Sequence, residues 1–447
     1  LTVTLLILIK SVRHLTPALL TCDYVISDNR VSIIVQYRHS RQTAHKVFKN
    51  ESLEVNIGFD KLSSRSSSFS YSFYGNSFGW KCIASLVAWA LIWLWLPSKT
   101  FNGPTTSFGY TPVYQANGEL YYFISVAALL VISFVQPSIC VSIYENFGPI
   151  LGGLNILALS LCAYLWIKAK LKSDEKDPYL LDKKYPVLHE FYRGMELHPR
   201  ILGVDVKQLT NCRIGMIMWQ LLIIIFLIAG WQLHGFNGGH LVNVLLQTIY
   251  IYKFFRWETG YFNTLDITLD RAGYYLCWGC LVWIPSFYTF HSYFFVYHQP
   301  TLGSLANIMI FLLGLLSIYY NYNVDRQKEL FRTSLDKSVK IWGKPAQYLK
   351  VVYKTADGKQ RESKLLLSGW WGVARKINYT FELLAAFLWS VPGGFVFGIW
   401  PFLYFAFLLA LLVHRIYRDE SKCLDKYGRG WNDYCLKVKY RLIPYVF

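Results

Sequence analysis

The chain has 447 residues, of which 54% are hydrophobic and only 16% are charged, and 45 Lys and Arg against 27 Asp and Glu give a formal net charge of +18. Soluble domains usually carry about 25% charged residues. This composition excludes a disordered chain, a collagen and a coiled coil, and it disfavours a water-soluble enzyme, because one globule cannot bury so much apolar surface.

Long apolar runs dominate the chain after residue 80. A membrane-spanning helix needs about 20 mostly apolar residues. One run, 381–413, has Pro392, Gly393 and Gly394 near its middle and is predicted to form two helices joined by a tight turn. The other runs are approximately 82–97, 120–136, 149–167, 214–230, 239–255, 274–297 and 303–322. The sequence thus predicts an all-α, polytopic helical membrane protein with about nine to ten transmembrane helices.

Basic residues predict the orientation. The segment 325–376 contains 13 Lys and Arg against 5 Asp and Glu, and the tail 414–447 contains 8 against 4. The positive-inside rule places both on the cytoplasmic side. Orientation in the bilayer explains most of the positive charge, so no nucleic-acid partner is expected.

The first part of the chain differs from the rest. Residues 1–78 contain a basic stretch at 38–49 and a Ser-rich stretch at 62–72. We expect an unassigned, poorly ordered N-terminal segment over 1–78, followed by one membrane domain over 79–447.

Motifs of soluble enzymes do not explain the chemistry. The sequence lacks a G-x-G-x-x-G fingerprint, a Walker loop and an H-E-x-x-H motif. Cys277 and Cys280 have C-x-x-C spacing, but they lie inside an apolar run, so we expect no metal or redox role for them.

Polar residues near membrane segments are the better candidates for a site. Glu258, Asp266 and Asp270 lie close together in the chain, and either they form a membrane-edge loop with solvated charges or they bind or protonate a molecule held in the bilayer. Lys328 and Arg332 are four residues apart on any continuing helix, a spacing that suits a phosphate but also fits positive-inside anchoring.

Two further segments combine aromatic and basic residues. The stretch 368–379 contains Trp370, Trp371, Arg375 and Asn378, which offer a stacking surface and hydrogen-bonding groups, although an interfacial aromatic belt also accounts for the Trp residues. The tail 414–447 interleaves Arg, Lys and Tyr with acids, more than an electrostatic lipid-binding tail needs. These cytoplasmic elements together could enclose an anionic dinucleotide without a Rossmann fold.

The motifs resemble the membrane sterol reductases, the family of sterol 14-reductases, sterol 24(28)-reductases, delta-7 sterol reductases and the lamin B receptor. The segment Leu412–Pro444 resembles the C-terminal signature of the family. Phe191–Arg200 with Thr210–Arg213, Ala356–Lys359 with Ser363–Arg375, and Lys253–Pro285 are most similar to the delta-7 branch. The similarity covers about residues 79–447, and many relatives have His-Asp where this chain has Leu269-Asp270.

The resemblance implies NADPH-dependent reduction of the 7,8 double bond of a sterol in the endoplasmic reticulum membrane, by protonation of the alkene and hydride transfer. It implies a sterol substrate taken from the bilayer, contact with membrane lipids, and other sterol-synthesis enzymes as candidate partners. A sterol 14- or 24(28)-reductase and an inactive sterol-binding relative are the alternatives.

The resemblance also implies the site residues. Tyr250 is the expected proton donor, with Glu258 and Asp266 as the acids that orient it. The expected cofactor-binding residues are Lys328, Arg332, Leu366, Trp371, Asn378, Tyr379, Arg415, Asp419, Cys423, Lys426, Tyr427 and Tyr434.

Overall fold

The structure is a computed structural model that describes residues 73–106, 108–171, 185–334, 339–354, 360–394 and 396–447, and the backbone of two strands before them. The chain divides into two units, 1–70 and 71–447. In the first unit, β1 (Thr21–Ser27) pairs antiparallel with β2 (Arg30–Gln36). The rest of the segment expected to be poorly ordered lies, up to residue 72, outside the described residues.

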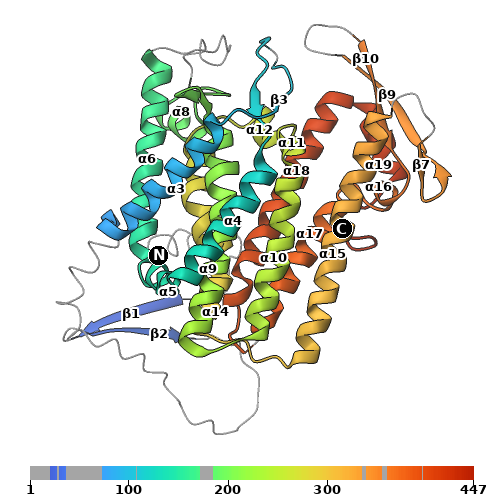
Figure 1. Ribbon diagram of the computed structural model, residues 1–447. Coiled ribbons are helices and arrows are strands. Elements are labelled where there is room, and N and C mark those ends of the chain that lie inside the picture. The colour runs from blue at the N-terminus through green and yellow to red at the C-terminus, as the bar shows by residue number, and fades with distance from the viewer. Residues whose placement is uncertain are drawn as a thin grey trace. The chain divides into compact units, whose positions relative to one another are not determined.

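The second unit is mostly helical, as expected (Figure 1). Its first half contains α3 (Ser77–Trp95), α4 (Gly118–Val135), α5 (Ser138–Glu145), α6 (Phe147–Leu171), α8 (Val187–Arg193), the π-helix η2 (Gln208–Gly215), α9 (Met216–His234) and α10 (Gly238–Arg256). Its second half contains α11 (Glu258–Tyr261), α12 (Leu265–Thr268), α13 (Tyr274–Trp278), the π-helix η3 (Gly279–Tyr288), α14 (Phe290–Phe295), α15 (Ser304–Thr333), α16 (Trp370–Val373), α17 (Ile377–Ser390), the 3₁₀ turns η4 (Val391–Gly393) and η5 (Trp400–Phe402), α18 (Leu403–Tyr427) and α19 (Arg429–Lys437).

Six helical segments of the described chain are long and apolar enough to cross a membrane. They are Ser77–Trp95, Gly118–Val135, Phe147–Leu171, Gln208–His234, Ser304–Thr333 and Trp400–Tyr427. The remaining predicted spans correspond to α10, to the segment from α13 to α14, and to α17, which has only 14 residues. The prediction of nine to ten spans is thus matched in part.

The run 274–297 is not one continuous helix. It consists of α13, the π-helix η3 and α14, and Pro285 lies inside η3. Proline removes a backbone N–H and clashes with the preceding turn, so a regular α-helix cannot continue through it.

Both helices that lead out of the apolar region extend beyond the predicted runs. α15 continues from the apolar run 303–322 to Thr333, and α18 continues through the tail to Tyr427, where Gly428 at φ 53° ends it. The connection predicted as a tight turn at Pro392 occupies residues 391–402 instead, with η4 at its start and η5 at its end.

The predicted cytoplasmic loop contains strands that we did not anticipate. β9 (Tyr348–Lys354) and β10 (Gln360–Leu366) form an antiparallel hairpin. Shorter antiparallel pairs are β3 (Thr100–Asn102) with β4 (Val113–Gln115), β5 (Arg200–Ile201) with β6 (Val204–Asp205), and β7 (Lys340–Ile341) with β8 (Lys344–Pro345). In Figure 1, α8, β3, β9 and β10 lie at the upper end of the helices and α14 lies near the lower end.

The main hydrophobic core lies between α9, α10, α17 and α18, and it contains the fully buried side chains of Trp219 and Trp389. A smaller cluster joins the end of α15 to α16 and β10 through Val324, Trp371 and Leu366. The candidate site is built where these two clusters meet.

Candidate active site

Four polar side chains from three helices meet at the end of the apolar part of α15. Lys253 of α10 forms an ion pair with Asp325, with Nζ 3.5 Å from Oδ2, and donates a hydrogen bond to Asn321. Asn378 of α17 donates to Asp325 Oδ1 at 3.3 Å, and its carbonyl accepts from Asn321 Nδ2 at 2.8 Å. The Oδ1 atom of Asn378 is buried and has no partner among the described residues, so one acceptor remains available to a bound group.

Trp371 forms a flat surface beside this network. Its ring is 5% exposed, and Nε1 donates to the carbonyl of Val324 at 2.9 Å. Lys328 Nζ lies 4.0 Å from the ring centroid, within range of a cation–π interaction. Leu366 belongs to the same cluster. The structure therefore brings three of the expected cofactor residues together at one point.

Tyr434 of α19 approaches Trp371 from the tail. Its hydroxyl donates to the carbonyl of Trp371 at 3.4 Å, and its ring stacks on Trp431 with the centroids 5.2 Å apart. Burial raises the pKa of the Tyr434 hydroxyl well above its usual value, so this group remains a hydrogen-bond donor at physiological pH.

Lys328 and Arg332 occupy successive turns of α15, as their spacing predicted, since the helix continues to Thr333. Among the residues that the structure describes, neither side chain forms an ion pair with a carboxylate. The Arg332 side chain is exposed. Two cations without acidic partners on one helix are suited to binding phosphate groups.

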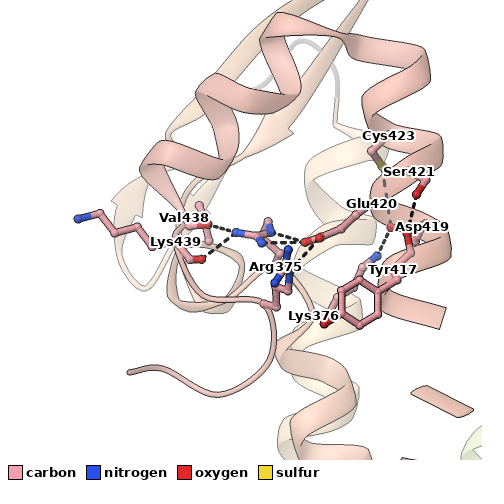
Figure 2. A network of polar contacts seen from close by, with 10 residues as sticks. Arg375, Lys376, Tyr417, Asp419, Glu420, Ser421, Cys423, Val438 and Lys439 are labelled. Atoms are coloured by element: carbon pink, nitrogen blue, oxygen red, sulfur yellow. Dashed lines mark hydrogen bonds and ion pairs between the residues drawn. The ribbon is translucent and has the colours of Figure 1, made fainter. Parts of the chain in front are cut away.

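Asp419 connects α18 to the start of α17. It forms an ion pair with Lys376 and lies 3.9 Å from Cys423 Sγ, which points toward its carboxylate (Figure 2). Lys376 Nζ lies 6.0 Å from the ring centroid of Tyr379. Asp419, Cys423 and Tyr379 are thus part of one group of contacts.

Arg375 fastens the tail to the loop before α17 (Figure 2). Its Nε and Nη2 atoms donate to Glu420 Oε1 at 2.9 and 2.7 Å, and Nη1 donates to the carbonyls of Val438 and Lys439 at 2.6 and 2.9 Å. Arg441 binds the second oxygen of Glu420 at 2.8 Å. Arg375, considered above as a ligand-binding group, is fully engaged in holding the tail.

Lys426 and Tyr427 lie against the β9–β10 hairpin. Lys426 Nζ is 4.5 Å from the ring centroid of Tyr353, and the Tyr427 hydroxyl is 3.4 Å from Ser363 Oγ. Cys423 and Tyr427 pack against the cluster that contains Tyr434, so this end of α18 borders the Trp371 group.

Tyr250 lies deeper in the bundle. Its hydroxyl donates a hydrogen bond to Glu382 Oε1 of α17 at 3.2 Å. Its ring centroid lies 6.0 Å from that of Trp219 and 5.5 Å from that of Trp389. Glu382 is one α-helical turn beyond Asn378, so α17 carries both the Asn378 acceptor and the partner of Tyr250 on one face.

Glu258 is not in contact with Tyr250. It pairs with Arg213, whose side chain is 0% exposed, and Oε2 accepts from Nη2 at 3.2 Å. Nη2 also donates to Asn117 at 2.7 Å, and the guanidinium lies 5.2 Å from the ring centroid of Tyr121. A Cβ atom on Gly118 would lie 2.2 Å from Glu258 Oε2, so α4 begins in direct contact with this ion pair.

Asp266 and Asp270 each pair with an arginine of α18. Asp266 binds Arg415 and Asp270 binds Arg418, both at 2.8 Å. Because α12 ends at Thr268, Asp266 and Asp270 do not lie on one continuous helix, and each binds a different arginine of α18. Asp266 and Arg415 are therefore brought together, away from any described contact with Tyr250.

Sequence reasoning missed several partners of the expected residues. Glu382 was visible as a lone acid in an apolar run, a pattern that indicates a functional position. Lys253 was likewise a charge inside an apolar run, 239–255, whereas Asp325 and Lys376 lie outside the apolar runs and carried no comparable signal.

Comparison with known proteins gives a family match over nearly the whole chain. The profile described as "Ergosterol biosynthesis ERG4/ERG24 family" matches residues 25–447. A 7-dehydrocholesterol reductase of Arabidopsis thaliana is 40% identical over 374 residues, which cover 82% of this chain and 85% of the relative. A 7-dehydrocholesterol reductase of Xenopus laevis is 35% identical and covers 77% and 73% of the two chains. A Delta(14)-sterol reductase of Methylotuvimicrobium alcaliphilum is 31% identical and covers 82% and 84%.

Proposed function

Because this chain belongs to the ergosterol biosynthesis ERG4/ERG24 family, we propose that it reduces the 7,8 double bond of a delta-5,7 sterol with NADPH. Family membership itself makes the protein a membrane-embedded oxidoreductase of sterol biosynthesis. The observation that carries the finer proposal is the 40% identity to the Arabidopsis 7-dehydrocholesterol reductase over 82% of this chain.

The residues at the end of α15 fit a nicotinamide dinucleotide. Lys328 and Arg332 lack acidic partners among the described residues and would hold phosphate groups. The Oδ1 atom of Asn378, which has no partner among the described residues, would accept a hydrogen bond from a carboxamide. NADPH, when bound, supplies the hydride of the reaction.

The other expected cofactor residues border the same region. Trp371 and Leu366 would form its apolar wall, and the tail would close it. We assign the remaining contribution to Tyr379 at the start of α17 and to the tail residues Arg415, Asp419, Cys423, Lys426, Tyr427 and Tyr434.

Tyr250 is the proposed proton donor. Protonation of one alkene carbon breaks the double bond and leaves a cation at the other carbon, which accepts the hydride, so one proton and one hydride are added in total. The aromatic rings of Trp219 and Trp389 around Tyr250 would exclude water from that cation. Glu382 accepts the hydrogen bond of the Tyr250 hydroxyl, so we assign to it the orienting role that was first expected of Glu258 and Asp266. After the reaction, Glu382 would also pass a proton back to Tyr250.

A reductase of the 14,15 double bond is the second candidate. The Methylotuvimicrobium Delta(14)-sterol reductase supports it, because the alignment covers 84% of that relative. Protonation and hydride transfer suit either double bond, so the position of the sterol in the bundle would decide between them.

The deciding experiment is turnover in microsomes with NADPH, with a 5,7-diene, an 8,14-diene and a 24(28)-ene sterol offered side by side. Loss of the 7,8 double bond alone is the expected result. Reduction of the 8,14-diene alone would contradict the proposal in favour of the second candidate, and no turnover of any sterol would favour a binding protein. We also propose residence in the endoplasmic reticulum, together with other sterol-synthesis enzymes, which fluorescence imaging and co-purification would test.

A further inference from the structure

Two stacked rings at the α14 end of the helical unit carry polar atoms that have no partner among the described residues. His291 of α14 and Trp389 of α17 are both 0% exposed, and their rings lie 6.4 Å apart at an interplanar angle of 12°. Both nitrogens of His291 and Nε1 of Trp389 make no hydrogen bond within the described part of the chain. These are three of the ten buried side-chain atoms in that condition.

The neighbouring polar groups are bonded, so the region is not simply poor in partners. Nε1 of Trp219 donates to Gln247 at 2.8 Å, and Nδ2 of Asn243 donates to the carbonyl of Trp389 at 2.7 Å. His240 is another buried histidine, and its Nε2 lies 2.9 Å from Ser292 Oγ. Buried polar groups are normally paired, so the unpaired atoms of His291 and Trp389 indicate a missing polar partner.

The position of the two rings relates them to the proposed site. Trp389 lies seven residues after Glu382, which is two turns along the same face of α17, or about 10 Å. The ring centroid of Trp389 lies 5.5 Å from that of Tyr250 and 6.4 Å from that of His291. The two rings with unpaired nitrogens therefore lie beside the proposed proton donor.

The chemistry of the unpaired atoms defines what they can bind. A neutral histidine has one donor and one acceptor nitrogen, and an indole N–H is only a donor. A hydroxyl group can accept from Trp389 and donate to His291 at the same time. A sterol is an apolar skeleton with a single hydroxyl, which would otherwise be buried without a partner.

We propose that His291 and Trp389 form the subsite that binds the hydroxyl of the sterol substrate, at the end of the interior opposite the cofactor residues. The proposal rests on the proposed sterol reduction. An ordered water molecule has the same hydrogen-bonding chemistry, and the test below separates the two sources.

The experiment compares a 3-hydroxy-5,7-diene sterol with its 3-deoxy counterpart in the full-length protein in nanodiscs. His291→Leu removes both nitrogens, and Trp389→Phe removes only the indole donor while keeping an aromatic ring. His240→Leu is the matched control, because it removes a buried histidine whose partner is already known. Two quantities are measured: kcat/KM with NADPH, and thermal stabilisation by each sterol without NADPH.

The wild-type protein should prefer the hydroxylated sterol by about 10- to 100-fold. His291→Leu should reduce this preference to less than about 3-fold, Trp389→Phe should reduce it partly, and His240→Leu should preserve it. A preference that is unchanged in both His291→Leu and Trp389→Phe would overturn the proposal and leave a water site.

The stabilisation measurement keeps the two proposals distinguishable. If the wild type turns over no sterol, the proposed function fails. Selective stabilisation by the hydroxylated sterol that disappears in His291→Leu would still support the subsite, whereas equal stabilisation by both sterols would overturn it as well.

Discussion

Two regions of the helical unit hold cations in opposite ways. Both terminal nitrogens of Arg213 are bonded to Glu258, and the pair is sealed from solvent at 0% and 4% exposure. Lys328 lies over Trp371, and one turn later Arg332 is exposed, with no carboxylate bound to either among the described residues. A buried cation that is paired with a carboxylate of the same protein stabilises the fold. A cation without such a carboxylate is available to bind a ligand.

The largest effect should come from breaking the sealed pair. Glu258→Ala leaves Arg213 buried without its counter-charge, which should lower the free energy of unfolding by about 3–5 kcal/mol. Thermal unfolding of the purified protein would measure the loss. The matched control is Glu119→Ala, which breaks a pair with Arg256 that is 64% exposed and should cost no more than about 1 kcal/mol.

The second effect concerns the proposed proton donor. Tyr250→Phe removes the hydroxyl that donates to Glu382, and it should lower turnover of the sterol by about 10²- to 10⁴-fold while the melting temperature stays nearly constant. Tyr252→Phe, two residues away and bonded to Glu119, should retain normal turnover. Similar rates for the two variants would remove Tyr250 from the chemistry.

A third variant tests whether Lys328 and Arg332, the cations without a bound carboxylate among the described residues, bind phosphate. Arg332→Ala should weaken NADPH binding by about 10- to 100-fold without changing the fold, because it removes charge-assisted hydrogen bonds. Isothermal titration with NADPH would measure the change. Arg326→Ala on the same helix is also an exposed arginine and serves as control; equal losses in both would point to general electrostatic attraction instead of a site.

The smallest effect should come from the pair between Asp270 and Arg418. Arg418 is 37% exposed, so Asp270→Asn should change the free energy of unfolding by no more than about 1 kcal/mol. Denaturant titration would measure it. If Asp270→Asn lowered the free energy of unfolding as much as Glu258→Ala, the distinction between buried and partly exposed ion pairs would be wrong.

The sequence predicted the features that depend on local pattern. Apolar runs identified all six candidate spans, because a bilayer requires a long stretch of apolar residues in one segment. The extension of α18 to Tyr427 was missed because hydrophobicity ends before the helix does, and Gly428 is the first residue that stops it.

The site was predictable in its residue types but not in its pairs. Lys328 and Trp371 were recognised from motifs, yet the contact between them needed the fold. Arg375 and Glu420 lie 45 residues apart, and Asp270 and Arg418 lie 148 apart. No rule of sequence spacing predicts contacts between residues so far apart in the chain, because the packing of the intervening helices determines which residues meet.

The hydrogen bonds from Arg375 to the tail have a consequence for the biosynthesis of the protein. The carbonyls that it binds belong to residues synthesised more than 60 positions later, 63 for Val438 and 64 for Lys439. At the usual speed of translation, these two residues are synthesised roughly 3 to 13 seconds after Arg375. All helices of the main core, α18 included, precede these carbonyls in the chain, so the contact that fastens the tail forms after the core helices have been made. A stop codon just after Tyr427 would therefore keep all six candidate spans and remove this contact.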